Sequence, residues 1–287
     1  FTKIFHPRIT SPLCFLLFFY VILFLMNPLS NNVTPEHRQE PERPLFSIIT
    51  VTYNAEATLP ATIESVVSQT CSLYEHIIID GESTDSTVEV ARNATHPLMR
   101  FHSSPDEGIY DAMNKGLAEA TGDYVIFLNA GDTFHSPGTL QRIADTIMGN
   151  DYPGIVYGQT DIVDDRRRRL GPRHLTAPEH LTLKSFADGM VVCHQAFVAL
   201  RRITAPYDLR YRFSADYEWC IRVLQHSRRN VLLPEVIIDY LNEGTTTRNH
   251  RRSLIERFRI MCYYYGTFPT LLRHVRFAAR ALKRKTL

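Results

Sequence analysis

The segment Phe46-Ser-Ile-Ile-Thr-Val-Thr-Tyr53 decides the fold class, because its apolar and β-branched residues predict a buried β-strand. Further strands and helices then alternate along the chain. The predicted strands are 76–80, 99–103 and 124–128, and the predicted helices are 59–69, 86–93 and 109–120, the last capped by Gly122. This alternation predicts an α/β protein in which helices cover both faces of a mostly parallel sheet.

The composition indicates a globular protein and argues against several other classes. The chain has 287 residues, of which 44% are hydrophobic and 22% charged, so it can bury the core of one large or two small domains. Its net charge of +2 does not indicate a nucleic-acid-binding protein, so we expect no nucleic-acid partner. The five cysteines lie far apart without a Cys-x-x-Cys pair, so neither a zinc ribbon nor a thioredoxin-type site is supported.

Polar residues directly follow three of the predicted strands. They are Thr52, Tyr53 and Asn54, then 80–85, and then 129–132. Each alone would fit a turn or a helix cap. Together they predict one site, because ligands bind at the carboxyl ends of strands in such sheets. The chain has neither a Gly-x-Gly-x-x-Gly nor a P-loop motif, which argues against a dinucleotide oxidoreductase and a P-loop enzyme. An Asp at this edge of the sheet suits a divalent cation, and such a cation can bind a diphosphate.

Four motifs occur in order along this region. They are Ser47-Ile-Ile-Thr-Val-Thr-Tyr-Asn54, Ile78-Ile-Asp-Gly-Glu-Ser-Thr-Asp-Ser-Thr87, Asp106-Glu-Gly-Ile-Tyr-Asp-Ala-Met-Asn-Lys-Gly116 and Thr121-Gly-Asp-Tyr-Val-Ile-Phe-Leu-Asn-Ala-Gly-Asp132. With them, the stretch 46–242 resembles the family 2 inverting glycosyltransferases of the Rossmann-like GT-A fold, in particular bacterial enzymes of polysaccharide and colanic-acid-type synthesis. The resemblance implies a mostly parallel sheet flanked by helices, with a helical C-terminal extension.

The resemblance also implies a nucleotide-sugar donor, taken to be a UDP-sugar, and a divalent metal, Mn²⁺ or Mg²⁺. The residues that it places beside the donor are Thr52, Tyr53, Asn54, Asp80, Ser83, Asp106, Asp111, Lys115 and Asn129. Asp132 is the implied metal ligand, as the last acid of Asn129-Ala-Gly-Asp132. Gly131 stands where a second acid is common, which puts a second carboxylate contact in doubt. Lys115 on a solvated helix face, and Asp111 opposing a helix dipole, are the structural alternatives.

The catalytic base is expected later in the chain, on the acceptor side. In the resembling enzymes an acid just before a helix takes this role, and Asp216 holds that place at the start of the predicted helix 213–224. Glu218 is the alternative base, and a charge that only stabilises the helix N-terminus is the alternative role for Asp216. His194 and Gln195 resemble the acceptor-side strand, although a lone histidine among apolar residues is more often part of the core.

The two ends of the chain differ in character from its middle. Segment 1–44 holds an apolar run at 13–26 that could anchor the chain in a membrane, followed by a polar linker. The expected GT-A domain, 45–241, has a net charge of −8, whereas the tail 242–287 has 11 Lys and Arg against 2 Asp and Glu. Helices expected at 254–265 and 269–283 suit an anionic membrane surface, or pack on the domain with their arginines in water.

These features predict a peripheral or singly anchored enzyme at the cytoplasmic face of a bacterial inner membrane, with a glycan or a lipid-linked acceptor. Two alternatives remain at this point. One is a catalytically weak nucleotide-sugar-binding module of a membrane complex, and the other is a nucleotidyltransferase. The run 166–169 of four arginines is expected at a hairpin tip, either solvated or in contact with lipid head groups or an anionic acceptor.

Overall fold

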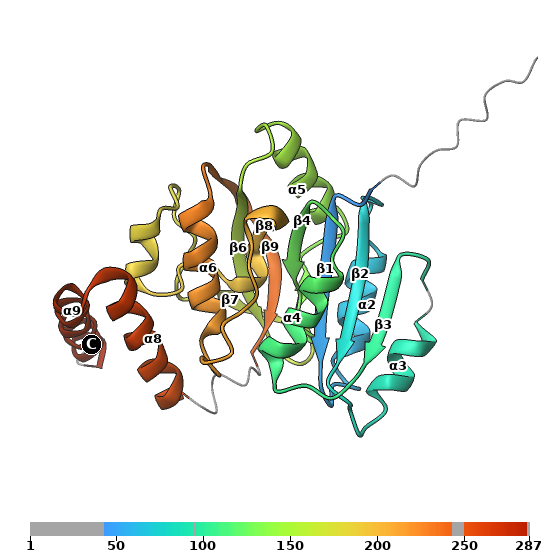
Figure 1. Ribbon diagram of the computed structural model, residues 1–287, viewed down its shortest axis with the longest axis horizontal. Helices are drawn as coiled ribbons and strands as arrows, with labels where there is room; N and C mark the ends of the chain where they lie inside the picture. The colour runs from blue at the N-terminus through green and yellow to red at the C-terminus, as the bar shows by residue number, and fades with distance from the viewer. Residues whose placement is uncertain (1–42, 95, 243–249, 286–287) are drawn as a thin grey trace, which may run out of the picture. The chain divides into compact units, whose positions relative to one another are not determined.

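The computed structural model describes residues 43–94, 96–242 and 250–285. Within these residues, nine strands form one sheet in the order β3-β2-β1-β4-β8-β6-β9-β5, with β7 paired to β6 (Figure 1). The strands are β1 (Phe46–Thr52), β2 (Tyr74–Asp80), β3 (Met99–Ser103), β4 (Tyr124–Phe127), β5 (Thr133–Phe134), β6 (Ile155–Val163), β7 (Arg169–Pro172), β8 (Phe197–Leu200) and β9 (Asn230–Leu241).

Helices lie on both faces of this sheet, as the alternating pattern predicts (Figure 1). They are α2 (Leu59–Val67), α3 (Thr87–Asn93), α4 (Ile109–Glu119), α5 (Thr139–Met148), α6 (Ala215–His226), α8 (His250–Tyr265) and α9 (Thr267–Lys285), with short 3-10 helices η1 (Leu183–Asp188), η2 (His194–Ala196) and η3 (Arg201–Ile203). On β1, Ile49 packs in a core cluster with Met113 of α4 and Trp219 of α6. Its neighbour Ile48 packs in another cluster with Leu140 of α5, because successive side chains point to opposite faces.

The sheet has a parallel half and a mixed half. Strands β3, β2, β1 and β4 are parallel, and Thr52 is in register with Asp80, which is in register with Ser103. Strand β8 is antiparallel to β4 and β6, whereas β6 and β9 are parallel. The carboxyl ends of the four parallel strands therefore meet at one edge.

The role of Gly122 differs from the cap that the sequence predicts at the end of helix α4. Helix α4 ends at Glu119, and Ala120 already has an extended backbone. A Cβ atom on Gly122 would lie 2.6 Å from the backbone nitrogen of Ser47. Glycine is therefore required here because β1 approaches closely, and the predicted C-terminal cap is wrong.

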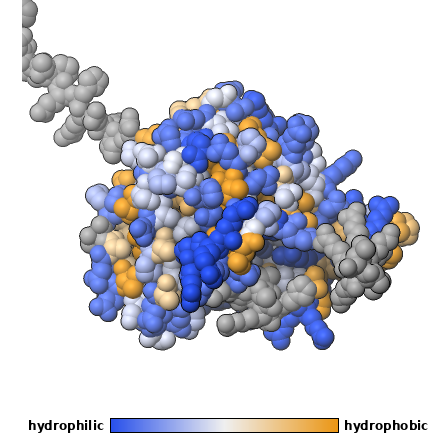
Figure 2. Space-filling view, turned by 180° about the vertical axis from the view of Figure 1, so that it is seen from behind, coloured by the Kyte–Doolittle hydropathy of each residue, from blue (hydrophilic) through white to orange (hydrophobic). Residues whose placement is uncertain are grey.

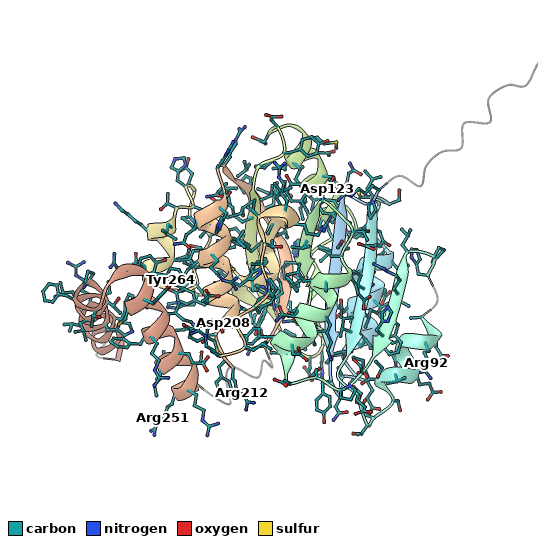
Figure 3. The ribbon with its side chains drawn as sticks, in the orientation of Figure 1. Arg92, Asp123, Asp208, Arg212, Arg251 and Tyr264 are labelled. Atoms are coloured by element: carbon teal, nitrogen blue, oxygen red, sulfur yellow. The ribbon has the colours of Figure 1, made fainter. Side chains whose placement is uncertain are left out.

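Both predicted C-terminal helices form, and they contact the body of the protein. Ile260 and Met261 of α8 are buried in the core cluster that contains α6. Tyr264 lies on the side of α8 that faces α6 (Figure 3) and donates to Glu218 at 2.6 Å. The end of α8 that carries Arg251 points away from the body (Figure 3). The described part of α8 thus packs on the domain rather than extending from it.

The apolar run at 13–26 lies outside the described residues. Of the helices that the structure does describe, none combines the length and the apolar character needed to cross a membrane.

Candidate functional site

The first predicted polar residues converge at the carboxyl edge of the parallel strands. Thr52 and Asp80 end neighbouring strands in register. Pairing of β1 with the chain after β4 continues beyond the strand, because the N–H of Ala130 donates to the carbonyl of Val51 at 3.3 Å. Thr52, Asp80 and Asn129 therefore lie along one edge, as expected from the parallel order.

Asp80 is wholly buried and organises the loop that follows β2. Its carboxylate accepts hydrogen bonds from the Ser83 hydroxyl at 2.5 Å, the Ser83 N–H at 3.0 Å and the Ser103 hydroxyl at 2.6 Å. These bonds connect the ends of β2 and β3 and satisfy the buried carboxylate. Asp80 and Ser83 thus shape this edge together, and direct contact of either with a donor stays a prediction.

Asn54 connects the first strand end to the same loop. Its backbone has a φ of +48°, a conformation that Asn tolerates better than most residues. Its amide oxygen accepts the N–H of Thr84 at 2.9 Å, and its own N–H donates to Ser83 Oγ at 2.8 Å. The neighbouring Tyr53 is 62% exposed, so its ring is open to a ligand.

Two buried oxygens at this edge have no hydrogen-bond partner among the described residues. They are Oγ1 of Thr52 and Oδ1 of Asn129. Buried polar atoms are rarely left unsatisfied, so such atoms call for an explanation. Both belong to the predicted donor-binding set and lie at the ends of the adjacent strands β1 and β4, where a bound ligand would satisfy them.

Asp106, Asp111 and Lys115 form a connected group before and within α4. Asp106 accepts the N–H of Gly108 at 2.8 Å and packs so closely on Gly81 that a Cβ there would lie 2.3 Å from its carboxylate. Lys115 lies 3.4 Å from Asp111 and donates to the Pro105 carbonyl at 2.5 Å. The Lys115 charge is thus partly neutralised within α4, and its place beside the donor stays a prediction.

Asp132 is buried at the centre of the site, where three segments meet. Its carboxylate accepts a hydrogen bond from the Gln195 amide at 2.7 Å and one from the N–H of Leu241 at 3.0 Å. Burial raises the pKa of Asp132 to about 7, although both of these hydrogen bonds and the charge of Arg167 act in the opposite direction. Gln195, predicted on the acceptor side, therefore contacts the predicted metal ligand directly.

The motif 129–132 offers oxygen ligands for a divalent cation. Each Asp132 oxygen retains a lone pair after the hydrogen bond it accepts. The unpartnered Oδ1 of Asn129 adds an amide oxygen. Hard cations such as Mg²⁺ and Mn²⁺ take oxygen ligands. The residues present therefore fit a divalent metal, with one carboxylate rather than two.

The backbone explains why the motif lacks a second acid. Gly131 has a φ of +106°, which side-chain-bearing residues rarely adopt. A Cβ at this position would also lie 2.9 Å from the Leu241 side chain. An acid at 131 would strain the backbone and displace the end of the Leu241 side chain.

Asp216 lies in the first turn of α6 and is half-buried. The Tyr110 hydroxyl of α4 donates to its Oδ1 at 3.1 Å. Tyr240 of β9 has a raised pKa, mainly because it is buried, and the negative charges of Asp132 and Asp216 contribute.

Glu218 is held differently, although it lies two residues further along α6. It is 5% exposed, pairs with Arg222 at 2.8 Å and accepts the Tyr264 hydroxyl at 2.6 Å. The Arg222 contact lies within α6 and the Tyr264 contact reaches α8, and together they occupy the carboxylate. Glu218 therefore joins α6 to α8, and Asp216 is the better candidate for a base.

Replacing Glu218 with Ala should lower the free energy of unfolding by about 3 kcal/mol, because removal of one partner leaves the other groups of a buried pair uncompensated. Urea unfolding followed by Trp219 fluorescence measures the change. The matched variant Tyr264→Phe removes one hydrogen bond and should cost about 1 kcal/mol. Equal stability of Glu218→Ala and the wild type would show that this network does not hold α8 in place.

The sequence profile of glycosyl transferase family 2 matches residues 47–205, which is more than half of the chain. The chain belongs to glycosyl transferase family 2. A PGL/p-HBAD biosynthesis glycosyltransferase of Mycobacterium bovis is 34% identical over 206 residues, which cover 70% of this chain and 77% of the relative. The predicted family is therefore confirmed, and the protein is a transferase enzyme.

Solved structures confirm the GT-A fold of this glycosyltransferase. S. aureus TarS 1–349 in complex with UDP-GlcNAc has a TM-score of 0.63 at 19% identity, over 81% of this chain and 73% of TarS 1–349. Mannosyltransferase PcManGT from Pyrobaculum calidifontis, in complex with GDP-Man and Mn²⁺, has a TM-score of 0.54 at 16% identity, over 92% of this chain and 82% of PcManGT.

His194 of the glycosyltransferase lies in an aromatic cluster. It is 4% exposed, stacks on Phe127 and shares a hydrogen bond of 2.7 Å with the Tyr207 hydroxyl. Burial lowers its pKa to about 4, so the ring is neutral at physiological pH. These contacts match the core-histidine alternative, and an acceptor-side role for His194 stays a prediction.

Two residues near the site were not singled out from the sequence. Tyr110 lies within the motif 106–116, so it could have been found beside Asp111. Tyr240 could not, because it comes from the distant strand β9. Arg167 belongs to the run 166–169 of four arginines that the sequence places at a hairpin tip, but its partner could not be predicted. The hairpin itself is confirmed, but its tip is more than a solvated turn, since Arg167 donates to the Gly131 carbonyl at 2.5 Å.

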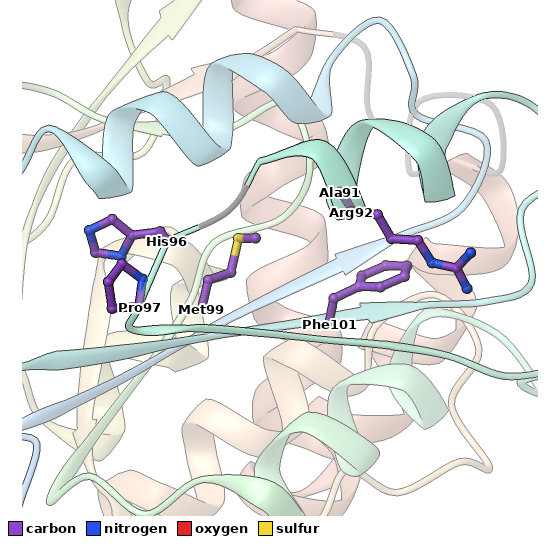
Figure 4. Close-up of a pocket in the computed structure, with 6 residues that line it drawn as sticks. All are labelled: Ala91, Arg92, His96, Pro97, Met99 and Phe101. Atoms are coloured by element: carbon purple, nitrogen blue, oxygen red, sulfur yellow. The ribbon is translucent and has the colours of Figure 1, made fainter.

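Two other features of the glycosyltransferase do not involve the predicted site residues. A pocket between α3 and β3 is lined by Ala91, Arg92, His96, Pro97, Met99 and Phe101, and none of the predicted site residues line it (Figure 4). Ligand atoms of His135, Asp161 and Asp239 lie within 4.8 Å of one another, at β5, β6 and β9. Arg169 already pairs with both Asp161 oxygens, so we assign no metal there.

Proposed function

We propose that this glycosyltransferase moves a sugar from a nucleotide-sugar donor, a UDP-sugar, to a glycan or lipid-linked acceptor, with inversion and with the help of a divalent metal. The observation that carries the proposal is that the buried Asp132, positioned by hydrogen bonds from Gln195 and Leu241, closes the motif 129–132 at the carboxyl edge of the parallel strands. Further support comes from the unpartnered oxygens of Thr52 and Asn129, and from neighbours that bind UDP-GlcNAc and GDP-Man.

In this proposal Asp216 is the general base. It takes the proton of the acceptor hydroxyl as that oxygen attacks the anomeric carbon. A bond forms between them while the bond from the anomeric carbon to the diphosphate oxygen breaks, so the configuration inverts. The Tyr110 hydroxyl holds Oδ1 of Asp216, which leaves Oδ2 for the acceptor.

Asp132 and Asn129 are the residues that would hold the metal. When bound, a divalent cation stabilises the negative charge that grows on the leaving diphosphate. Thr52, Tyr53 and Asn129 line the edge where the nucleotide diphosphate is proposed to bind.

The purified full chain tests the proposal, with UDP- and GDP-sugars supplied in turn with Mn²⁺ or Mg²⁺. Transfer to an acceptor glycan, or release of free UDP or GDP, would support it. Absence of both turnover and nucleotide binding over the whole donor set would contradict it. The family assignment already favours glycosyl transfer over the nucleotidyltransferase alternative.

A second candidate is a catalytically weak nucleotide-sugar-binding module within a membrane complex. The observation that favours it is Gly131, because its backbone excludes a second carboxylate from the motif. Binding of UDP without any transfer or hydrolysis in the same experiment would select this candidate.

We also propose that α9 docks on the anionic cytoplasmic face of a membrane. Its residues Phe268, Leu271, Leu272 and Val275 are 49 to 71% exposed, and their spacing places them on one side of the helix. Figure 2, seen from behind, shows hydrophobic and hydrophilic residues side by side at the edge where the C-terminal helices lie. From Arg257 to Leu287 the chain has eight Lys and Arg and no acid, which suits anionic lipid.

The double variant Leu271→Glu/Leu272→Glu should lose binding to phosphatidylglycerol vesicles, because it places acids in the apolar stripe. Co-sedimentation at low and high salt measures the loss, and wild-type binding should weaken as salt screens the arginines. Met148→Glu is the matched control, since Met148 is similarly exposed, at 48%, on α5. Unchanged binding by the double variant, or equal binding of neutral vesicles, would contradict this membrane role.

A further inference from the structure

The four arginines between β6 and β7 have different partners. Arg168 pairs with Asp164 at 2.7 Å, and Arg169 pairs with Asp161. Arg167 pairs with no acid among the described residues and instead donates from Nη1 to the Gly131 carbonyl at 2.5 Å. The side chain of Arg166 makes no hydrogen bond or ion pair within the same part of the chain. Arg167 alone of the run therefore contacts the motif that carries Asp132.

The turn that carries Arg167 is tightly built. The Asp164 carboxylate accepts the N–H groups of Arg166 at 3.0 Å and Arg168 at 2.8 Å, and the Asp164 carbonyl accepts the N–H of Arg167 at 3.0 Å. Arg167 has a φ of +61°, which costs free energy for a residue with a side chain. The turn holds Arg167 in this conformation and thereby directs its side chain to the motif.

The hairpin is also aligned with the strand that supports Asp132. Val163, the last residue of β6, is in register with Leu241 of β9. The N–H of Leu241 donates to Asp132 at 3.0 Å. The same short region therefore fixes both the Asp132 carboxylate and the Arg167 guanidinium next to Gly131.

The charge of Arg167 matters because the motif has only one acid. Gly131 cannot be replaced by an acid without strain, so any metal has a single carboxylate to hold it. A guanidinium carries five N–H donors, and the Gly131 carbonyl uses one of the Arg167 donors. The planar fork of the remaining donors matches phosphate oxygens.

We propose that Arg167 is a donor-binding residue that contacts the diphosphate of the nucleotide sugar and stabilises its charge as it leaves. This inference rests on the proposed function. It assigns the hairpin between β6 and β7 to the donor site. Arg167 would supply there a fixed positive charge that does not depend on a metal.

The variant Arg167→Gln tests this role, with Arg166→Gln as the matched control from the same turn. Glutamine retains an N–H that can reach a carbonyl but carries no charge. Titration calorimetry with UDP, GDP, UMP and GMP, with and without Mn²⁺, measures nucleotide affinity. We expect Arg167→Gln to weaken binding of the preferred nucleoside diphosphate about tenfold, which is about 1.4 kcal/mol. Binding of the corresponding monophosphate should weaken less. Arg166→Gln should match the wild type.

The outcomes separate this inference from the function on which it rests. If the wild type binds neither UDP nor GDP, the proposed function fails. If the wild type binds one of them and Arg167→Gln binds it equally well, only the role of Arg167 fails. Equal weakening of diphosphate and monophosphate would also overturn it, because a residue that merely supports the loop does not distinguish phosphate number. Thermal unfolding of both variants checks that the fold is retained.

Discussion

Replacing Asp216 with Asn should slow sugar transfer by about 100-fold or more, because a positioned general base contributes about 10²- to 10⁴-fold to the rate. The affinity for UDP or GDP should not change, since Asp216 acts on the acceptor in the proposed mechanism. Asn has nearly the same shape, and its amide oxygen can still accept the Tyr110 hydroxyl. Single-turnover transfer and calorimetric titration of the nucleotide measure the two effects.

Two further variants make this result specific to Asp216. Asp208→Asn changes an acid that is not among the predicted site residues and that pairs with Arg210 at 2.6 Å, so transfer should persist. Glu218→Gln tests the alternative base and should retain transfer in the folded protein. If Asp216→Asn transfers sugar as fast as the wild type, the base assignment is wrong, and a loss confined to Glu218→Gln would move the role to that residue.

Replacing Asp132 with Ala should lower transfer by about 100-fold, equivalent to about 2.7 kcal/mol, and should remove the effect of Mn²⁺ on UDP affinity. The physical reason is that Asp132 is the carboxylate in the motif that is proposed to hold the metal. Calorimetric titrations of UDP with and without Mn²⁺ measure this effect. Asp165→Ala is the control, because Asp165 is an exposed acid in the nearby hairpin. Retention of the Mn²⁺ effect in Asp132→Ala would assign the metal to other residues.

The pH dependence of metal binding gives a second measurement on Asp132. Because burial raises its pKa to about 7, the carboxyl is largely protonated at lower pH. A metal binds only the ionised form, so Mn²⁺ affinity should rise between about pH 6 and pH 8. In the metal-free protein, the folding stability that Asp132 contributes changes with pH in the opposite direction to the Mn²⁺ affinity. A pKa raised above its unfolded value contributes stability at low pH that is lost as pH rises through about 7.

The parallel half of the sheet could be predicted because its signals are local. The apolar, β-branched stretch 46–53 indicates a buried strand from its own residues, and the helical spacing at 59–69 comes from its own periodicity. Parallel order then places Thr52, Asp80 and Asn129 at one edge, as the structure has them. The mixed half was harder to predict, because β8, β6 and β9 pair with partners distant in the sequence.

The sequence also identified the acids of the site but not their surroundings. Asp216 and Glu218 are two residues apart, and both lie in the first turn of α6. Only the packed structure shows that Glu218 pairs with Arg222 and accepts a hydrogen bond from Tyr264. Asp216, in contrast, accepts one hydrogen bond, from Tyr110. Helical geometry sends side chains two positions apart in different directions, so their partners depend on which neighbours pack there.

The sequence by itself determined the family of this protein, its α/β architecture and the strand ends where its polar residues meet. The tertiary structure decided which of those residues are already engaged by other side chains and which residues surround Asp132. Tyr110 and Asp216 are 106 residues apart, Asp132 and Leu241 are 109 apart, and Gly131 and Arg167 are 36 apart. Contacts at such separations arise only when the chain has packed, because no local propensity encodes them.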